Sequence, residues 1–185
     1  MGLAVEERQK YEKVWKDDRY RVFSPGERFV SLFRQMVRPR RGSRLLDAGC
    51  GTGRAGVALS ADFDVTLCDF VDARDEAAKA LPFFKANLWS PKFRSQKGWD
   101  YIYCCDVLEH IPPSRVDAVL RHLTAHTTKG AFFSICHEKA HFKGEGGEPL
   151  HLTVQPFEWW LKKLGEYGTV KHARHLLQNG VFYVV

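Results

Sequence analysis

The chain has 185 residues, enough for one α/β domain but too few for a second domain of any size. Its composition, 44% hydrophobic with 13% aromatic residues, is typical of a globular protein and excludes a disordered chain. The formal net charge of +6 favours contact with polyanions, and no run of about 18 apolar residues is present, so no membrane span is expected.

The cysteines and the N-terminus favour a cytoplasmic location. Five cysteines are present, an odd number, and they lie in or beside apolar, strand-like runs. This pattern favours reduced thiols over a disulfide framework. The charged N-terminus lacks the apolar core of a signal peptide. We therefore expect one cytoplasmic domain, spanning residues 1–185, that makes no contact with a membrane.

Helices are predicted to precede the sheet, over residues 1–40. Residues 1–22 carry aromatic and apolar side chains at helical spacing. Ser24 and Pro25 then predict a new helix, because a hydroxyl residue before a proline favours a helix start. Pro39 ends that helix, and the first strand follows it.

The most informative stretch is RLLDAGCGTGR, residues 44–54. A short apolar run leads into Asp47, and three glycines follow at alternate positions, Gly49, Gly51 and Gly53. Glycine lets the backbone turn sharply and lets a ligand approach its N–H groups. The start of the next helix adds unpaired N–H donors and the positive end of a dipole. The stretch therefore predicts a loop that binds a nucleotide-like ligand.

Two interpretations of this loop compete. Gly51, Gly53 and Gly56 match the G-x-G-x-x-G fingerprint of dinucleotide-binding proteins. That interpretation requires the strand to reach Cys50, which would leave Asp47 inside a buried strand at a cost in free energy. If the strand ends at Asp47, the carboxylate lies at the strand tip and faces a cationic ligand. S-adenosylmethionine, with its α-ammonium and sulfonium groups, is such a ligand.

A second acid is predicted at the end of the next strand, VTLCD at residues 65–69. A carboxylate at this position, Asp69, can accept two hydrogen bonds from a ribose diol. This holds for NAD and for S-adenosylmethionine alike. Asp69 therefore predicts an adenosine site without choosing between the two cofactors.

Alternating helices and strands are predicted for the rest of the chain. The expected elements are a helix at 72–81, a strand at 83–88, a strand at 100–104, a helix capped by Ser114, a strand at 131–136, a polar loop, a helix at 156–165, a strand at 168–177, an Asn179-Gly180 hairpin turn and a strand at 181–185. Within them, WDYIYCCDVLEH at residues 99–110 stands out, because a buried strand runs directly into an acidic loop that ends in His110.

Two stretches, LDAGCGTGR at 46–54 and WDYIYCCDVLEH at 99–110, closely resemble the first motif and the fourth-strand signature of class I S-adenosylmethionine-dependent methyltransferases. The resemblance implies an α/β fold: a Rossmann-like three-layer sandwich around a mostly parallel seven-stranded sheet with an antiparallel C-terminal strand. It also implies N-terminal helices that cap the cofactor site and a core over residues 41–185. The layout of the chain loosely resembles that of small phage-encoded members.

The same resemblance implies which residues contact the cofactor, S-adenosyl-L-methionine. They are Asp47, Gly49, Cys50, Gly51, Gly53, Asp69, Phe70, Asn87, Leu88, Cys105 and Asp106, with Tyr20 and Arg21 from the N-terminal segment. Asn87 also has a simpler interpretation as a turn residue.

Two histidines are candidates for chemistry on the acceptor. His110 closes the DVLEH motif, although it could instead be a helix-start histidine that is hydrogen-bonded to the backbone. His151 lies on the rim where the acceptor should enter, and either histidine could act as a general base. Cys136, His137, His141 and His151 lie near one strand end, but their spacing matches no tight ligand pattern. We therefore predict no metal site.

The predicted function is methyl transfer from S-adenosylmethionine to an unidentified acceptor. The positive charge favours a nucleic acid or modified base slightly over a small molecule. Against this, neither the Asn/Asp-Pro-Pro-aromatic motif of base-amino methyltransferases nor a Pro-Cys nucleophile pair is present. The alternatives are an inactive cofactor-binding subunit of a partner protein and a nicotinamide-dependent oxidoreductase.

Overall fold

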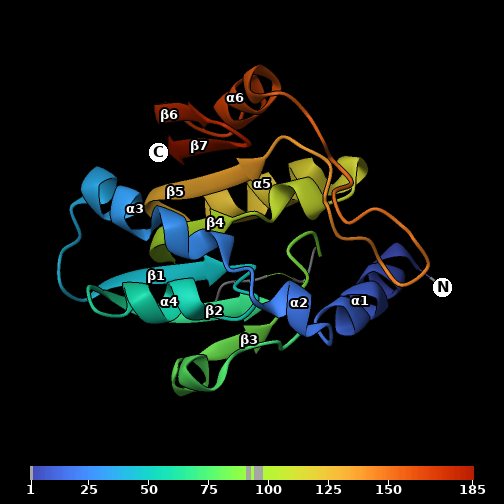
Figure 1. Ribbon diagram of the computed structural model, residues 1–185. Helices are drawn as coiled ribbons and strands as arrows, with labels where there is room; N and C mark the ends of the chain where they lie inside the picture. Colours follow the sequence, from blue (N-terminus) through green and yellow to red (C-terminus); the bar gives the residue numbers. More distant parts are fainter. Residues whose placement is uncertain (1, 91–92, 94–97) are drawn as a thin grey trace.

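A seven-stranded sheet, in the order β3-β2-β1-β4-β5-β7-β6, forms the centre of the computed structural model, which describes residues 2–90, 93 and 98–185 (Figure 1). The strands are β1 (Ser43–Ala48), β2 (Phe63–Asp69), β3 (Phe83–Lys85), β4 (Trp99–Cys105), β5 (Thr127–Cys136), β6 (Val170–Leu176) and β7 (Asn179–Val184). Strands β1 to β5 are parallel, and β7 is antiparallel to both of its neighbours. The predicted fold class is confirmed.

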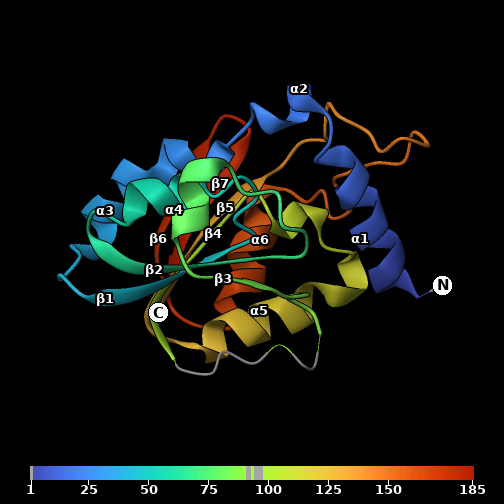
Figure 2. The same cartoon turned by 90° about the horizontal axis from the view of Figure 1, so that it is seen from below.

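Helices cover both faces of the sheet and complete the three layers (Figure 2). The α-helices are α1 (Leu3–Val14), α2 (Asp18–Arg21), α3 (Val30–Val37), α4 (Arg54–Leu59), α5 (Val116–Ala125) and α6 (Phe157–Gly165), and the 3-10 helices are η1 (Pro25–Phe29), η2 (Glu76–Ala80), η3 (Leu108–His110) and η4 (Pro113–Arg115). Phe33 of α3 and Leu59 of α4 are buried on one face, with Phe63 and Tyr103. Trp160 of α6 is buried in the cluster on the other face.

The order of the strands reverses between β1 and β4, because β2 and β3 continue to one side of β1 and β5 to the other. Parallel sheets bind ligands at such a switch point, beyond the carboxyl ends of the strands. Helices α1 and α2 lie at that end, whereas α3 lies over the sheet (Figure 1). Of the predicted N-terminal cap, α1, α2 and the 3-10 helix η1 thus contribute to the site, whereas α3 does not.

Several predicted element boundaries are wrong. The helix expected at 72–81 is only the 3-10 helix η2, and the strand expected at 83–88 ends at Lys85. The reason for the first difference is tertiary, since the Asp75 N–H donates to the Thr52 carbonyl at 2.9 Å instead of to a helical partner. Ser24 precedes the 3-10 helix η1, Ser114 is the middle residue of η4, and neither 3-10 helix has a side-chain cap hydrogen bond.

The C-terminal hairpin turns two residues earlier than predicted. Leu177 and Gln178 form the turn, with Leu177 at φ +38°, and Asn179 and Gly180 pair inside the ladder with β6. Asn179 is held there because its side-chain amide donates to Asp106 Oδ1 at 3.0 Å and to the Ser134 hydroxyl at 3.2 Å. A long-range polar contact therefore overrides the local turn preference. No helix of the described residues is long and apolar enough to cross a membrane.

Candidate active site

Two adjoining cavities open at the carboxyl ends of the central strands. The described residues enclose a large cavity of about 760 Å³ and a small cavity of about 110 Å³. Both cavities are lined by Trp15, Tyr20, Gly49, Asp106 and His110, so these five residues mark the junction between them. The glycine loop and the strand-end acids predicted from the sequence therefore lie around one composite site.

The three glycines of the loop have different tasks. All have positive φ, between +52° and +80°. A Cβ on Gly51 would lie 2.9 Å from the Trp15 ring, so glycine is required for Trp15 to lie over the loop. A Cβ on Gly53 would lie 2.5 Å from the Cβ of Ala78, and Gly53 lines neither cavity. Gly49 lines both, whereas Gly53 serves the packing of α4 against η2.

Asp47 is buried under the loop with one free oxygen. Strand β1 runs one residue past it, to Ala48, so the carboxylate is 3% exposed and not at an open strand tip. It lines the large cavity, and its Oδ2 has no hydrogen-bond partner among the described residues. Burial, and secondarily the charge of Asp69, raises the pKa of Asp47 to about 7. A cationic ligand group would offset both effects.

Asp69 lines the small cavity together with Phe70. Its Oδ1 accepts the Phe70 N–H at 2.6 Å and the Val71 N–H at 3.2 Å, and its Oδ2 accepts the Gly51 N–H at 2.8 Å. Oδ2 thus keeps a second lone pair that a ribose hydroxyl could use. Burial raises the pKa of Asp69, against the lowering effect of these three hydrogen bonds.

The far wall of the small cavity is built by the segment after β3. Leu88 and Trp89 line it, and the Trp89 and Phe70 rings lie 5.4 Å apart. Asn87 does not line it, because its side-chain oxygen accepts the Trp89 N–H at 3.1 Å and closes a turn. Trp89 is absent from the sequence prediction, and only its position next to Leu88 could have indicated it.

The N-terminal segment covers the junction of the cavities with aromatic rings. Trp15 and Tyr20 meet edge to face, with ring centroids 4.8 Å apart. Arg21 lines neither cavity, because its guanidinium pairs with Asp75 at 2.7 Å. The other Asp75 oxygen accepts the Arg54 side chain at 2.6 Å. Arg21 thus fastens the segment to the core, and a contact with the cofactor stays a prediction.

Three thiols face the large cavity: Cys50, Cys105 and Cys136. Burial raises the pKa of all three above the ordinary value, for Cys136 to about 11.

Asp106, which follows Cys105, has φ +52°, and its carboxylate accepts a hydrogen bond from the Ser134 hydroxyl at 3.2 Å. A non-glycine residue in this region is unusual, and here it lies at the junction of the cavities.

Both candidate histidines line the large cavity, with ring centroids 4.6 Å apart. His110 ends η3, and its Nδ1 lies 2.7 Å from the Tyr11 hydroxyl and 3.1 Å from the Leu150 carbonyl. The sequence left two interpretations of His110 open, a position facing the acceptor and a hydrogen bond to the backbone. The structure shows both features together. Burial, with the nearby His151, lowers the pKa of His110 to about 3.

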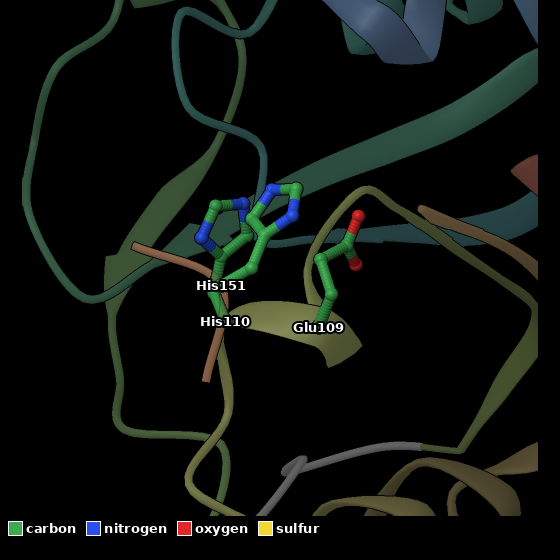
Figure 3. A group of neighbouring side chains, drawn as sticks. All are labelled: Glu109, His110 and His151. Atoms are coloured by element: carbon green, nitrogen blue, oxygen red, sulfur yellow. The ribbon is translucent and has the colours of Figure 1, made fainter. Parts of the chain in front are cut away.

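Glu109 joins the two histidines and is a site residue that the sequence prediction missed. One carboxylate oxygen and one ring nitrogen of each histidine lie within 4.8 Å of one another (Figure 3). Glu109 is fully buried, and burial, with the charge of Asp106, raises its pKa well above the usual range. The set considered and set aside in the sequence analysis, Cys136, His137, His141 and His151, is not among the groups that the described residues bring together in this way, and His137 stacks on Phe157 and His175.

A cluster of arginines that contributes to the positive charge of the chain lies away from the site. Arg38, Arg40 and Arg41 precede β1 and Arg44 is its second residue, at the end opposite the cavities. The large cavity is lined by Arg28 and Lys139 but also by several acids, among them Asp47 and Asp106. Nothing in this arrangement favours a nucleic acid at the site.

The fold and the glycine loop define a Rossmann-like nucleotide-cofactor domain, and comparison with known proteins identifies its family. A family model described as a methyltransferase domain matches residues 14–178. The chain therefore belongs to the methyltransferase-domain family.

Similar proteins share part of the sequence of this chain or its fold. The chloroplast magnesium protoporphyrin IX methyltransferase of Arabidopsis thaliana is 31% identical over 105 residues, which are 50% of this chain and 32% of that protein. The match thus spans about a third of the relative's length. A DhpI–SAH complex superposes with a TM-score of 0.75 over 99% of this chain and 97% of that one, at 14% identity. ChlM of Synechocystis PCC 6803 with bound SAH superposes with a TM-score of 0.64 over 86% of this chain and 82% of that one, at 18% identity.

Proposed function

We propose that the protein transfers the methyl group of S-adenosylmethionine to a small-molecule acceptor. The observation that carries the proposal is the glycine loop between two carboxylates, the buried Asp47 facing the large cavity and the partly buried Asp69 facing the small one. Adenosine would occupy the small cavity, with its ribose on Asp69. The methionine part would extend past Gly49 toward Asp47, and the acceptor would fill the rest of the large cavity.

Charge favours S-adenosylmethionine over a nicotinamide cofactor. A dinucleotide needs the helix N-terminus behind the loop for its pyrophosphate. Here Gly53, the residue before α4, packs against Ala78, and the nearby Thr52 and Ala55 line the same large cavity as Asp47. The nearest unpaired group is the Asp47 carboxylate, which would repel a pyrophosphate and attract an ammonium or sulfonium.

Cavity size and lining support a small acceptor. Ligand sites of about 300–1,000 Å³ suit small molecules, and the large cavity has about 760 Å³. Its outer wall includes Phe23 and Phe142, whose rings lie 5.5 Å apart, and Tyr20, which meets Phe142 at the same distance. Two similar proteins are named as methyltransferases of magnesium protoporphyrin IX, which is also a small molecule. Methyl transfer from a sulfonium mainly requires alignment of the acceptor with the methyl carbon, and these aromatic rings offer apolar surface for that purpose.

Calorimetric titration with S-adenosylhomocysteine tests the proposal first. We expect saturable binding by the wild type and at least about tenfold weaker binding by Asp69→Asn, since a charge-assisted hydrogen bond contributes about 1.5–3 kcal/mol. Binding of NAD without S-adenosylhomocysteine would instead establish the oxidoreductase alternative.

A transfer assay with methyl-labelled S-adenosylmethionine then separates the acceptor classes. We expect label in a metabolite extract and none in RNA or DNA. Label in nucleic acid would refute the small-molecule assignment. Cofactor binding without transfer to any pool would favour an inactive partner subunit.

A further inference from the structure

We propose that Glu109, His110 and His151 bind a divalent transition-metal ion at the wall of the large cavity. These three are the one group of potential ligands that the described part of the chain brings within 4.8 Å of one another (Figure 3). Two imidazoles and one carboxylate form a ligand set that binds zinc, iron or cobalt and leaves positions open. Ligand atoms about 2.1 Å from one ion lie at most about 4.2 Å apart, so small side-chain rotations close this set around an ion.

Both histidines are oriented with an unprotonated nitrogen available. The Nδ1–H of His151 donates to the Glu138 carbonyl, which leaves the lone pair on Nε2. His110 Nδ1 lies 3.1 Å from the Leu150 carbonyl oxygen. If Nδ1 were unprotonated, its lone pair would face a lone pair of that oxygen, and the two would repel each other. The proton is therefore on Nδ1, with the Tyr11 hydroxyl as a second acceptor, and Nε2 is again free. A backbone carbonyl behind each ring is the arrangement that fixes metal-binding histidines.

Glu109 supplies an independent reason for a cation. Its Oε1 accepts the Cys136 N–H at 2.8 Å, but its Oε2 has no hydrogen-bond partner among the described residues. The side chain is fully buried, and such an orphan oxygen is expensive unless something pairs with it. Asp106, a second acid close enough to affect Glu109, receives its hydrogen bonds from Asn179 and Ser134 and not from a cationic side chain. A divalent ion would neutralise this acidic corner.

The position of the group indicates what the ion would bind. His110 lines both cavities and His151 lines the large one, so open coordination positions would face the space assigned to the acceptor. This role, unlike the binding itself, rests on the proposed function. A coordinated hydroxyl of the acceptor would lose its proton to water more easily. Its oxygen would then form a bond to the methyl carbon while the carbon–sulfur bond breaks and the electron pair stays on sulfur.

The proposal replaces the expectation of no metal site. That expectation considered Cys136, His137 and His141 with His151, all from one end of β5 and the loop after it. The structure instead brings His151 to η3, where Glu109 and His110 are neighbours. The joining contacts are the hydrogen bonds from the Leu152 and Thr153 N–H groups to the Glu109 carbonyl, at 2.7 and 2.9 Å. Such a contact across more than 40 residues leaves no pattern in the sequence.

Titration of EDTA-treated full-length protein with Co²⁺ and with Zn²⁺ tests the site. We expect one ion per chain and a visible Co²⁺ absorption spectrum typical of nitrogen and oxygen ligands. Glu109→Gln and His151→Ala should each weaken binding at least about 100-fold, since losing even a group behind a ligand costs about 10–100-fold. His175→Ala is the matched control, because its ring stacks on His137 at 5.2 Å outside this group and could bind an adventitious ion.

Two results would overturn the proposal. One is the absence of binding by the wild type; the other is binding that persists in Glu109→Gln and His151→Ala but is lost in His175→Ala. Titration of the same variants with S-adenosylhomocysteine shows whether they are folded and keep the cofactor site. Metal binding without cofactor binding would leave the cation site established and the proposed function refuted, whereas the reverse would refute only the cation site.

Discussion

The Asp47 carboxyl links the acidity of the solution to cofactor affinity. Because the pKa of Asp47 is about 7 in the free protein, near neutral pH about half of the molecules carry it uncharged. A ligand with a cationic methionine end binds the ionised form better. We expect the affinity for S-adenosylmethionine to rise by up to about tenfold between about pH 6 and about pH 8. Calorimetry across this range measures the change, and Asp47→Asn should show weak binding that does not vary with pH.

The same group lowers the stability of the free protein. Folding raises the pKa of this carboxyl from 3.8 to about 7. The free energy of unfolding therefore falls as the pH rises from about 3.8 to about 7, because the folded state holds the proton more tightly than the unfolded state. Asp47→Asn removes this penalty, so the variant should be more stable above pH 7, by up to about 4 kcal/mol. Urea unfolding at about pH 8 measures the difference. A variant that is less stable than the wild type there would contradict the assigned pKa.

Two glycines of one loop should respond differently to alanine. Gly51→Ala places a methyl group against the Trp15 ring, so we expect weaker binding of S-adenosylhomocysteine. Gly53→Ala places it 2.5 Å from the Cβ of Ala78, outside both cavities, so we expect lower stability, by about 1–3 kcal/mol, with affinity retained. Thermal melting and calorimetry on both variants separate the effects. Equal loss of affinity in the two would contradict the division of tasks.

At the scale of elements, one of the contacts that hold the N-terminal segment over the cavities is an ion pair. Arg21 of α2 pairs with Asp75 at 2.7 Å, both partly exposed, so the pair contributes about 1 kcal/mol or less. We expect Arg21→Ala to weaken binding of S-adenosylhomocysteine a few-fold. The matched control is Arg19→Ala on the same helix, whose guanidinium pairs only locally, with Asp17. If Arg21→Ala bound S-adenosylhomocysteine as tightly as the wild type, the result would contradict both the role of Arg21 in holding the segment and its predicted contact with the cofactor.

The sequence predicted those elements whose cause is local. The strands before Asp47 and Asp69 and the glycine loop between them follow from apolar runs and residues with restricted or permissive backbones. The helix expected at 72–81 does not form because the Asp75 N–H donates to the Thr52 carbonyl, in another segment, instead of to a helical partner. Similarly, Asn179 leaves its expected turn because its partners are Asp106 and Ser134. Long-range contacts have no local pattern and could not be predicted.

The candidate site shows the same division. The strand-end acids and the DVLEH loop were accessible because each lies in one continuous motif. Trp15 and Trp89 were missed as wall residues, since their role depends on how distant segments pack. Glu109 was visible within a motif, but its partnership with His151 exists only in the folded chain.

At the scale of the whole molecule, the C-terminal hairpin is coupled to the site through Asn179. Its buried side chain donates to Asp106, at the cavity junction, and to Ser134 of β5. We expect Asn179→Ala to lower the free energy of unfolding by about 1–3 kcal/mol, because it leaves buried acceptors without a donor. Gln178→Ala removes only an exposed side-chain hydrogen bond to Glu138, so the free energy of unfolding should change by less than about 0.5 kcal/mol. Urea denaturation compares the two, and similar losses would contradict the coupling.

The three thiols of the large cavity have a consequence for the lifetime of the protein. A sulfonium cofactor is an electrophile, and a thiolate beside it would compete with the acceptor for the methyl group. Only the thiolate is strongly nucleophilic, and burial keeps Cys50, Cys105 and Cys136 protonated at neutral pH by raising their pKa values. The desolvation that shapes the cavity thereby also protects the chain from alkylation by its own donor.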